Sequence, residues 1–249
     1  MFSKITWVRI WIVCIIFCIL LCPFNNLAQG KVKQDLETYF PLQADKQWKY
    51  RLVITQMGSE ITGTMEVKTL PKRKINGKDV IPYVQVATAQ TIFGQQSEQT
   101  IDFYLKDKYG VRLYASQKAN DTEPKLQEES HYILKLPLDE KTRWKHKEET
   151  TLLQENLTLD VESRIAAIDT TVTVSAGNFE HCVQVVTKGR KIKSMKMGLV
   201  NYGNAEVIFE ESRWYAPKVG LVKSIRKEQS DHWLVGIGGT AMFELMNPE

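Results

Sequence analysis

The sequence predicts an all-β protein: an antiparallel curved sheet or incomplete β-barrel built from two internal repeats of about five strands. The first observation behind this prediction is a series of short segments rich in β-branched and aromatic residues. The second is that Gly, Asn or Lys-Asp turns separate these segments. The third is that no convincing stretch repeats apolar residues at helical spacing. With 249 residues, the chain is long enough for a sizeable core.

Five strands are expected in the first half of the chain, at residues 48–56, 61–70, 79–88, 99–106 and 111–116. Tight turns join them at "MGSE" (57–60), "INGKD" (75–79) and "KDKYG" (106–110). Asn76-Gly77 is the clearest hairpin signal, because both residue types accept a positive φ.

Three short segments recur in the same order about a hundred residues later. "PLQADKQWKY" (41–50) returns as "PLDEKTRWKH" (137–146), "YVQVAT" (83–88) as "CVQVVT" (182–187), and "FYLKDKYGV" (103–111) as "WYAPKVGL" (214–221). The recurrence predicts a first β repeat at 31–116, a polar linker at 117–130 and a second β repeat at 131–249, with the two repeats sharing one core. The second repeat has its extra length in the basic stretch 188–206.

Each repeat opens with a tryptophan that is followed two residues later by another ring. Trp48 precedes Tyr50 and Trp144 precedes His146, so each pair points to one face of a strand. We interpret these rings as core packing at the end of the sheet, and the alternative is a pair of aromatic ligand clamps. Packing predicts that Trp48→Ala lowers the melting temperature.

The N-terminus has the pattern of an export signal. Lys4 and Arg9 precede the apolar run 10–22, and the small residues of "LAQG" (27–30) follow. We expect a signal peptide at residues 1–30, cleaved after Gly30 or Ala28, because the run is shorter than the roughly 20 residues of a spanning helix. Two other interpretations are an uncleaved anchor through residues 10–22 and lipidation at Cys22, although Leu21 stands where a small residue is expected.

Cysteine content and charge narrow the class of protein further. Three of the four cysteines lie in the leader, so the mature chain keeps only Cys182 and no internal disulfide. We expect Cys182 to be a small buried residue rather than a catalytic thiol. The formal net charge of +4 is too small to indicate a nucleic-acid binder.

No catalytic motif or metal-ligand spacing is legible, and no cofactor is expected. The four histidines, at 131, 146, 181 and 232, form no H-x-x-x-H pattern. "GIGGTA" (236–241) fits a dinucleotide pattern formally, but too few residues follow it for the helix and second strand of that fold. A glycine-rich strand or bend is expected there instead.

Two groups of residues are candidates for contacts with other molecules. A concave β face is expected to bind a lipid or other amphipathic molecule through Tyr50, Tyr83, Phe103 and Trp214. The basic clusters 71–78 and 189–197 are candidates for peripheral contact with anionic membrane head groups or an envelope protein, through Lys72, Arg73, Arg190, Lys191 and Lys193. The alternative for these clusters is a pair of solvated hairpin tips.

Residues 172–185 ("VTVSAGNFEHCVQV") and 213–224 ("RWYAPKVGLVKS"), together with 39–50, carry a family resemblance. They resemble segments of the TapB-like group of exported bacterial β proteins, whose domain has no assigned function. Ser175 and Lys218 depart from the group, which has Pro and Gly there. The resemblance implies an antiparallel β architecture similar to half-open barrels that shield lipid chains in the periplasm, and no catalytic residues.

The function expected from these observations is that of an exported, non-enzymatic protein of the periplasm or cell envelope. It would bind an apolar or amphipathic ligand, or a partner protein, on a concave β face. One alternative is a structural or assembly protein of the envelope. A hydrolase whose site forms only in three dimensions is the other, because catalytic triads are defined by geometry rather than by order in the chain.

Overall fold

A computed structural model describes residues 36–91, 94–197 and 200–247 of the chain. The predicted signal peptide, its cleavage sites, the anchor at 10–22 and Cys22 lie outside these residues. Within the described ranges, no helix has both the length and the apolar character needed to cross a membrane.

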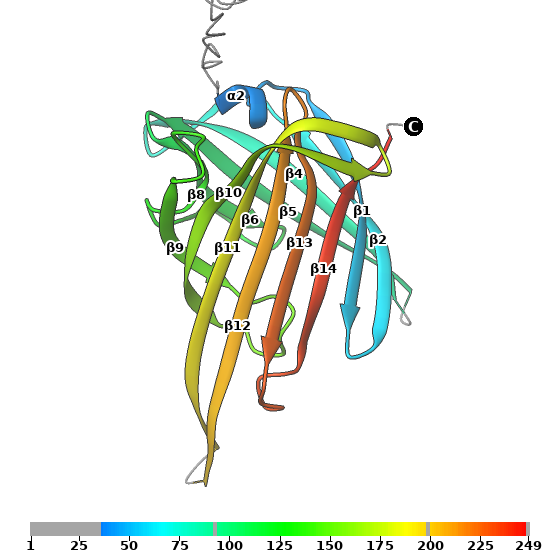
Figure 1. Ribbon diagram of the computed structural model, residues 1–249, viewed down its shortest axis with the longest axis vertical. Helices are drawn as coiled ribbons and strands as arrows, with labels where there is room; N and C mark the ends of the chain where they lie inside the picture. The colour runs from blue at the N-terminus through cyan, green and yellow to red at the C-terminus, as the bar shows by residue number, and fades with distance from the viewer. Residues whose placement is uncertain (1–35, 92–93, 198–199, 248–249) are drawn as a thin grey trace, which may run out of the picture. The chain divides into compact units, whose positions relative to one another are not determined.

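Nearly all of the regular secondary structure in the described chain is strand, which confirms the all-β prediction (Figure 1). Its one helical element, which the sequence pattern did not predict, is the single turn α2. The elements are α2 (Leu36–Tyr39), β1 (Gln47–Gln56), β2 (Ser59–Thr69), β3 (Arg73–Ile75), β4 (Lys78–Thr91), β5 (Gly94–Asp107), β6 (Gly110–Lys118), β7 (Lys125–Leu126), β8 (Tyr132–Lys135), β9 (Arg143–Glu149), β10 (Thr158–Val174), β11 (Gly177–Met197), β12 (Val200–Ala216), β13 (Gly220–Ser230) and β14 (Gly238–Leu245).

One antiparallel sheet contains the main strands in the order β7-β6-β5-β4-β2-β1-β14-β13-β12-β11-β10-β9. β3 pairs with β4, and β8 pairs with β6. The first and last strands meet in the middle of this order, where Tyr50 is the register partner of Leu245. The sheet curls so that β4, β5 and β6 lie behind β11 to β14 (Figure 1).

The segments that recur in the sequence occupy corresponding places in the sheet. "PLQADKQWKY" leads into β1 and "PLDEKTRWKH" into β9, while "YVQVAT" lies in β4 and "CVQVVT" in β11. The third pair spans the β5–β6 turn and the β12–β13 turn. Each set therefore belongs to a five-stranded meander, β1-β2-β4-β5-β6 or β9-β10-β11-β12-β13. The common origin of the two meanders stays a prediction.

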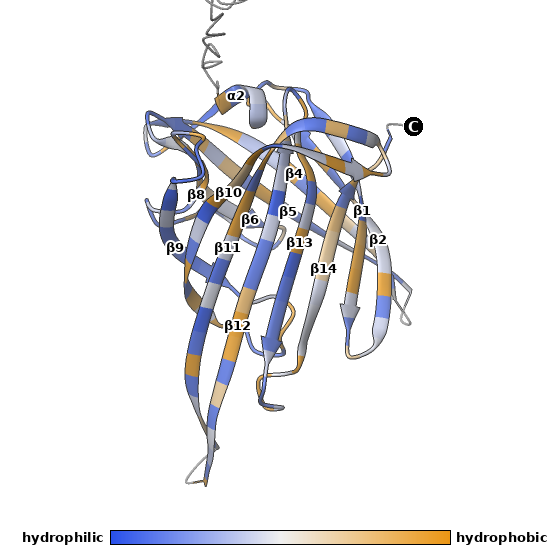
Figure 2. Cartoon of the chain, in the orientation of Figure 1, coloured by the Kyte–Doolittle hydropathy of each residue, from blue (hydrophilic) through white to orange (hydrophobic). Residues whose placement is uncertain are grey.

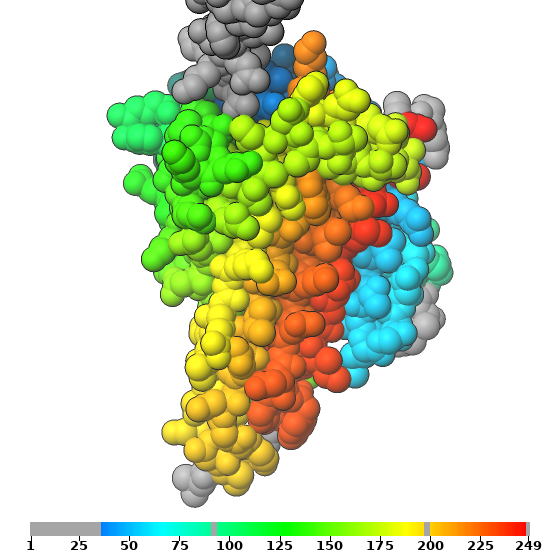
Figure 3. Space-filling view, viewed as in Figure 1, coloured from blue at the N-terminus to red at the C-terminus, as the bar shows by residue number. Residues whose placement is uncertain are grey.

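Two boundaries differ from those expected. β6 continues through Lys118, and β7 forms within the predicted linker 117–130, where it pairs with β6. The basic stretch 188–206, where the second repeat was expected to have its extra length, extends β11 and β12 into a long hairpin. Figure 3 shows this hairpin projecting beyond the ends of the neighbouring strands.

The turns follow their sequence signals. Asn76 and Gly77 have φ values of 48° and 75°, as the β3–β4 hairpin requires. Met57 and Gly58, at the turn between β1 and β2, likewise have positive φ values of 51° and 77°. Gly238, where "GIGGTA" enters β14, has a φ of 90°, and a Cβ there would lie 2.0 Å from the carbonyl oxygen of Glu228. The glycine pattern therefore serves a close approach of two strands.

Hydrophobic and polar residues alternate along the strands, as Figure 2 shows. In β9 the alternation buries Trp144, His146 and Glu148 on one face. Trp144 packs in the largest core cluster, as expected for a packing residue, whereas Trp48 lies half-buried against that cluster and also lines a cavity. Cys182 is fully buried, as expected, and burial raises the pKa of its thiol to about 11.

The two ends of the sheet approach each other without pairing. Among the described residues, no backbone ladder joins β9 to β7 or β8. Side chains cross the gap instead: the Trp144 indole Nε1 donates to the carbonyl of Tyr132 (2.8 Å), and Lys147 Nζ donates to Glu128 (2.8 Å). The sheet is thus open and strongly curved, with an inner face that holds the candidate site.

Candidate functional site

Two adjoining cavities lie on the inner face of the curved sheet. The larger, with a volume of about 780 Å³, is lined by residues from both halves of the sheet, among them Lys118 of β6 and Arg226 of β13. Strands this far apart in the sheet can share a cavity only on the inside of its curl. The smaller cavity, of about 330 Å³, shares seven lining residues with the larger one, namely Met65, Gln85, Asp102, His131, Glu148, Arg226 and Phe243.

The smaller cavity, hereafter the aromatic cavity, has seven aromatic rings in its lining, together with five charged side chains. Trp48 stacks on Tyr83 with ring centroids 5.9 Å apart, and the ring of Tyr104 lies edge-on to Tyr83 at 4.9 Å. Tyr50 OH donates to the carbonyl of Leu221 at 2.9 Å. Burial raises the pKa of Tyr50, Tyr83 and Tyr104, so these phenols stay neutral. The cavity thus offers apolar ring surface with its hydroxyl groups already used.

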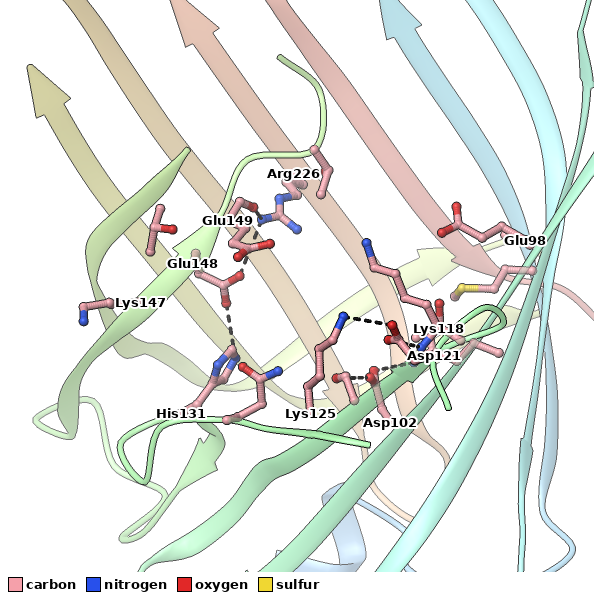
Figure 4. Close-up of a pocket in the computed structure, with 18 of the residues that line it drawn as sticks. Glu98, Asp102, Lys118, Asp121, Lys125, His131, Lys147, Glu148, Glu149 and Arg226 are labelled. Carbon is pink, nitrogen blue, oxygen red and sulfur yellow. Dashed lines mark hydrogen bonds and ion pairs between the residues drawn. The ribbon is translucent and has the colours of Figure 1, made fainter. Parts of the chain in front are cut away.

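The larger cavity, hereafter the charged cavity, is lined by ionisable side chains (Figure 4). Four are cationic and six are carboxylates: Lys118, Lys125, Lys147 and Arg226 against Glu98, Asp102, Asp121, Glu128, Glu148 and Glu149. Several are paired, as in the 2.8 Å bond from Lys125 Nζ to Asp121. The excess of carboxylates favours a cation or a zwitterion over an anion as the bound group.

Asp102 lies where the two cavities meet and is held by three donors. Its Oδ1 accepts from Ser116 Oγ (2.6 Å), and its Oδ2 accepts from Gln85 Nε2 (2.6 Å) and Tyr104 OH (3.3 Å). Burial raises the pKa of this carboxyl above its usual value, although the three hydrogen bonds act in the opposite direction.

This raised pKa predicts that Asp102→Asn increases the melting temperature at pH 7. The folded state binds the Asp102 proton more tightly than the unfolded state, so the carboxyl contributes most to stability below its unfolded pKa of about 3.9. That contribution is lost as the pH rises through the folded pKa. Asparagine can accept on one side and donate to Ser116 on the other, so the advantage of the variant is expected to shrink as the pH falls towards 4.

Thermal unfolding from pH 4 to pH 8 measures this effect, with Asp79→Asn as the control. Asp79 is exposed, and a hydrogen bond and charge from Lys74 lower its pKa, so its contribution has the opposite pH dependence. A melting temperature for Asp102→Asn below that of the wild type at pH 7 would contradict the prediction.

Buried ion pairs connect the cavities to the core. Arg213 Nη2 lies 2.6 Å from Glu211 Oε2. Burial acts to lower the pKa of Arg213, but the negative charges around it, that of Glu211 first, outweigh burial and raise this pKa. Arg226 lies 2.9 Å from Glu228 through its Nε and 3.5 Å from Glu148 through its Nη2. Each arginine is thus matched by a carboxylate, as buried charges require.

His131, His146 and Glu148 form a compact cluster at the gap between the two ends of the sheet. The Nε2 atoms of His131 and His146 lie 3.5 Å and 3.2 Å from Glu148 Oε1. Burial alone would raise the pKa of Glu148, but hydrogen bonds from both histidines and the charge of Arg213 hold it well below its usual range. Burial lowers the pKa of His146. Figure 4 shows His131 and Glu148 directed towards each other.

The structure brings two of the four predicted ligand-binding residues to the site. Tyr50 and Tyr83 line the aromatic cavity. Phe103 does not: it lies between Asp102 and Tyr104, which face the cavity, so its side chain points to the other face of β5 and packs in a separate cluster. Trp214 packs against the main core and lines neither cavity.

The predicted basic contacts lie outside the cavities. Lys72 precedes β3, and Arg73 lies over the ring of Phe103 at 4.9 Å. The other three residues are in β11, where Arg190 pairs with Glu206, Lys193 pairs with Glu155, and Lys191 donates to the carbonyl of Thr158 (2.7 Å). The first cluster is a hairpin tip, whereas the second runs along a strand.

Sequence spacing missed the polar residues of the site. His146 and Glu148 are two residues apart on one strand, so the sequence alone could have placed their side chains on the same face. His131 lies before β8, and only the approach of the two sheet ends brings it to them. Asp102 and Arg226 likewise require knowledge of which face of the sheet is concave.

Comparisons with known proteins leave the function to be argued from the chain itself. No family model matches it, and no curated protein matches its sequence. Two crystal structures of bacterial proteins are similar to 84% of the chain and to 98% of their own length. One, from Bacteroides fragilis, is described as an inferred exported protein with a YMCC-like fold (13% identity, TM-score 0.36). The other, from Parabacteroides distasonis, is described as an inferred lipoprotein (12% identity, TM-score 0.37).

Proposed function

We propose that this chain is an exported, non-enzymatic protein of the cell envelope that binds an amphipathic ligand on the inner face of its sheet. The observation that carries the proposal is the junction of the aromatic cavity with the charged cavity. An apolar group would lie against the rings of Trp48, Tyr83 and Phe243, and a polar head would lie among the charged side chains. Export rests on the N-terminal signal pattern, and the TapB-like resemblance agrees with it.

The size and charge of the cavities define the ligand class further. Volumes of about 330 Å³ and 780 Å³ are in the range of small-molecule sites. Because carboxylates outnumber cations around the charged cavity, the head group is expected to be zwitterionic or cationic. The proposal therefore concerns lipids and detergent-like molecules whose head group carries a positively charged nitrogen.

Calorimetry with dodecylphosphocholine and dodecyl sulfate tests this proposal, because the two probes share a tail and differ in head-group charge. The purified full chain should bind dodecylphosphocholine more tightly when both are below their micellar concentrations. Native mass spectrometry of the same preparation should show co-purified lipid. Equal binding of both probes, or no binding of either, would contradict the proposal.

A pair of methionine variants provides the matched control. Met65 lines both cavities, so Met65→Lys should reduce the affinity for dodecylphosphocholine at least tenfold. Met57 is 69% exposed at the turn of the same hairpin, so Met57→Lys should bind like the wild type. Equal losses in both variants would place the binding outside the cavities.

A second candidate function, peripheral contact with a membrane surface, is favoured by the tip of the β11–β12 hairpin. Tyr202 of β12 is exposed near this tip, and its ring centroid lies 6.4 Å from that of the exposed Trp233 in the connection between β13 and β14. In the same connection, His232 Nε2 lies 3.2 Å from the carbonyl of Tyr202. The basic cluster 189–197 runs along the same hairpin. Tyr and Trp rings beside lysines are a combination typical of a membrane interface.

Co-sedimentation with phosphatidylcholine vesicles, with and without phosphatidylglycerol, tests the membrane contact. Binding should increase with the anionic lipid and fall in Trp233→Ser. Tyr109→Ser is the control, because Tyr109 is also exposed but lies at the β5–β6 turn. Binding that is insensitive to anionic lipid, or that falls equally in both variants, would exclude this role.

A further inference from the structure

The cluster of His131, His146 and Glu148 has the composition and spacing of a metal site with three protein ligands. We infer that these residues bind one divalent transition-metal ion, with zinc the best fit, at the gap between the two ends of the sheet. One ligand atom from each residue lies within 4.8 Å of the others. Two imidazoles and one carboxylate are a donor set that suits zinc and related ions.

The distances are close to those a bound ion requires. Metal–ligand bonds of about 2.0–2.2 Å in a tetrahedral arrangement place neighbouring ligand atoms roughly 3.4 Å apart. Glu148 Oε1 lies 3.2 Å from His146 Nε2 and 3.5 Å from His131 Nε2. Small side-chain rotations would therefore bring all three atoms onto one ion.

The surroundings hold two of the ligands in position. Glu148 directs Oε1 to the histidines, while its Oε2 lies 3.5 Å from Arg226 Nη2, so the arginine orients the carboxylate from behind. The His131 backbone is fixed on both sides, since its N–H donates to Glu128 (3.1 Å) and its carbonyl accepts from Leu113 (3.0 Å). The ligands thus belong to a built site rather than to a mobile surface cluster.

The third ligand, His146, is held by burial. It lies in β9 next to the buried Trp144, and its Nδ1 atom is buried without a hydrogen-bond partner in the described structure. Its interaction with the cluster therefore goes through Nε2, the atom that faces Glu148.

The position of the ion suggests two consequences. His131 belongs to the segment before β8 and the other two ligands to β9. The ion would therefore join two sheet ends that no backbone ladder connects within the described part of the chain. His131 and Glu148 also line the charged cavity, which leaves a fourth coordination position for water or a polar group in that cavity. This inference does not depend on the proposed lipid ligand.

Metal binding by the purified full chain, stripped with a chelator, tests the inference directly. Dialysis against Zn²⁺ followed by elemental analysis should give one ion per chain, and Co²⁺ should give the visible absorption of a four-coordinate site. Mg²⁺ should bind weakly, because imidazole ligands do not suit it. Zn²⁺ should also raise the melting temperature, because an ion that binds only the folded state stabilises it.

Three variants decide which residues bind the ion. His131→Ala and Glu148→Gln should lower the Zn²⁺ affinity by more than the roughly 10–100-fold that loss of an outer-shell partner costs. His181→Ala is the matched control, because His181 is exposed on β11 and pairs there with Asp169. If Glu148→Gln does not fold, His131→Ala still decides, since His131 lies in a turn outside the strands.

The inference would be overturned if the wild type failed to bind one Zn²⁺ per chain, or if His131→Ala kept the wild-type Zn²⁺ affinity. It would also be overturned if His181→Ala lost as much Zn²⁺ affinity as His131→Ala, or if Zn²⁺ raised the melting temperatures of the wild type and His131→Ala equally. A failure of dodecylphosphocholine binding would leave it unaffected, because the two measurements use different probes.

Discussion

Trp144→Ala is expected to lower the free energy of unfolding by about 3–5 kcal/mol, the usual range for removing a buried tryptophan. The Trp144 side chain is 5% exposed and packs in the main core. Its Nε1 donates to the carbonyl of Tyr132 at 2.8 Å, which links β9 to the segment at the other end of the sheet. Alanine would therefore leave a large cavity and also remove a contact across the gap.

Urea denaturation measures this loss, and two other tryptophan variants calibrate it. Trp48 is only half-buried, so Trp48→Ala should cost less, although it also loses the 2.8 Å bond from Nε1 to the carbonyl of Val219. Trp233 is 66% exposed, so Trp233→Ala should change stability by no more than about 0.5 kcal/mol. A Trp144→Ala effect as small as that of Trp233→Ala would refute the packing role.

Glu228→Ala is expected to cost about 3–5 kcal/mol, because it removes one partner of a buried ion pair. Glu228 is 0% exposed in β13. It accepts the backbone N–H groups of Thr151 (2.9 Å) and Leu152 (2.7 Å), and it lies 2.9 Å from Arg226 Nε. Alanine would leave the buried N–H of Leu152 and the partly buried N–H of Thr151 without their acceptor, and Arg226 without its closest carboxylate.

The control for Glu228 is a carboxylate on the neighbouring strand. Glu210 of β12 pairs with Lys188 at 2.5 Å on the surface, so Glu210→Ala should cost no more than about 1 kcal/mol. Denaturation in urea with the same probe compares the two variants. Because Glu228 anchors residues 151 and 152 between β9 and β10, hydrogen exchange in its variant should also increase there. Equal stability of the two variants would contradict the anchoring role.

Much of the fold could be predicted from local sequence, because its determinants are local. Asn76-Gly77 marks a hairpin through its own backbone preference, and the alternation around Cys182 places that thiol in the core without knowledge of its neighbours. The single turn α2 and the short strand β7 could not be predicted in this way. Both are too short to carry a periodic pattern, and β7 pairs only with β6.

The site was harder to predict, because its residues meet only when the sheet curls. Tyr83 and Phe103 are equally aromatic, yet one lines the cavity and the other packs on the opposite face of the sheet. Which face is concave depends on the pairing order of all the strands, and no local pattern encodes that order. His131 reaches Glu148 for the same reason, across a gap that exists only in three dimensions.

The pairing of β1 with β14 has a consequence for how the protein is made. Tyr50 is among the first strand residues to be synthesised, and its register partner Leu245 is among the last. Until β14 has been synthesised, β1 and β13 each have an unpaired edge in the middle of the future sheet. Such contacts between distant residues form slowly. The nascent chain therefore cannot complete this sheet before β14 has been synthesised, so β1 must remain soluble with one edge unpaired while the intervening strands are made.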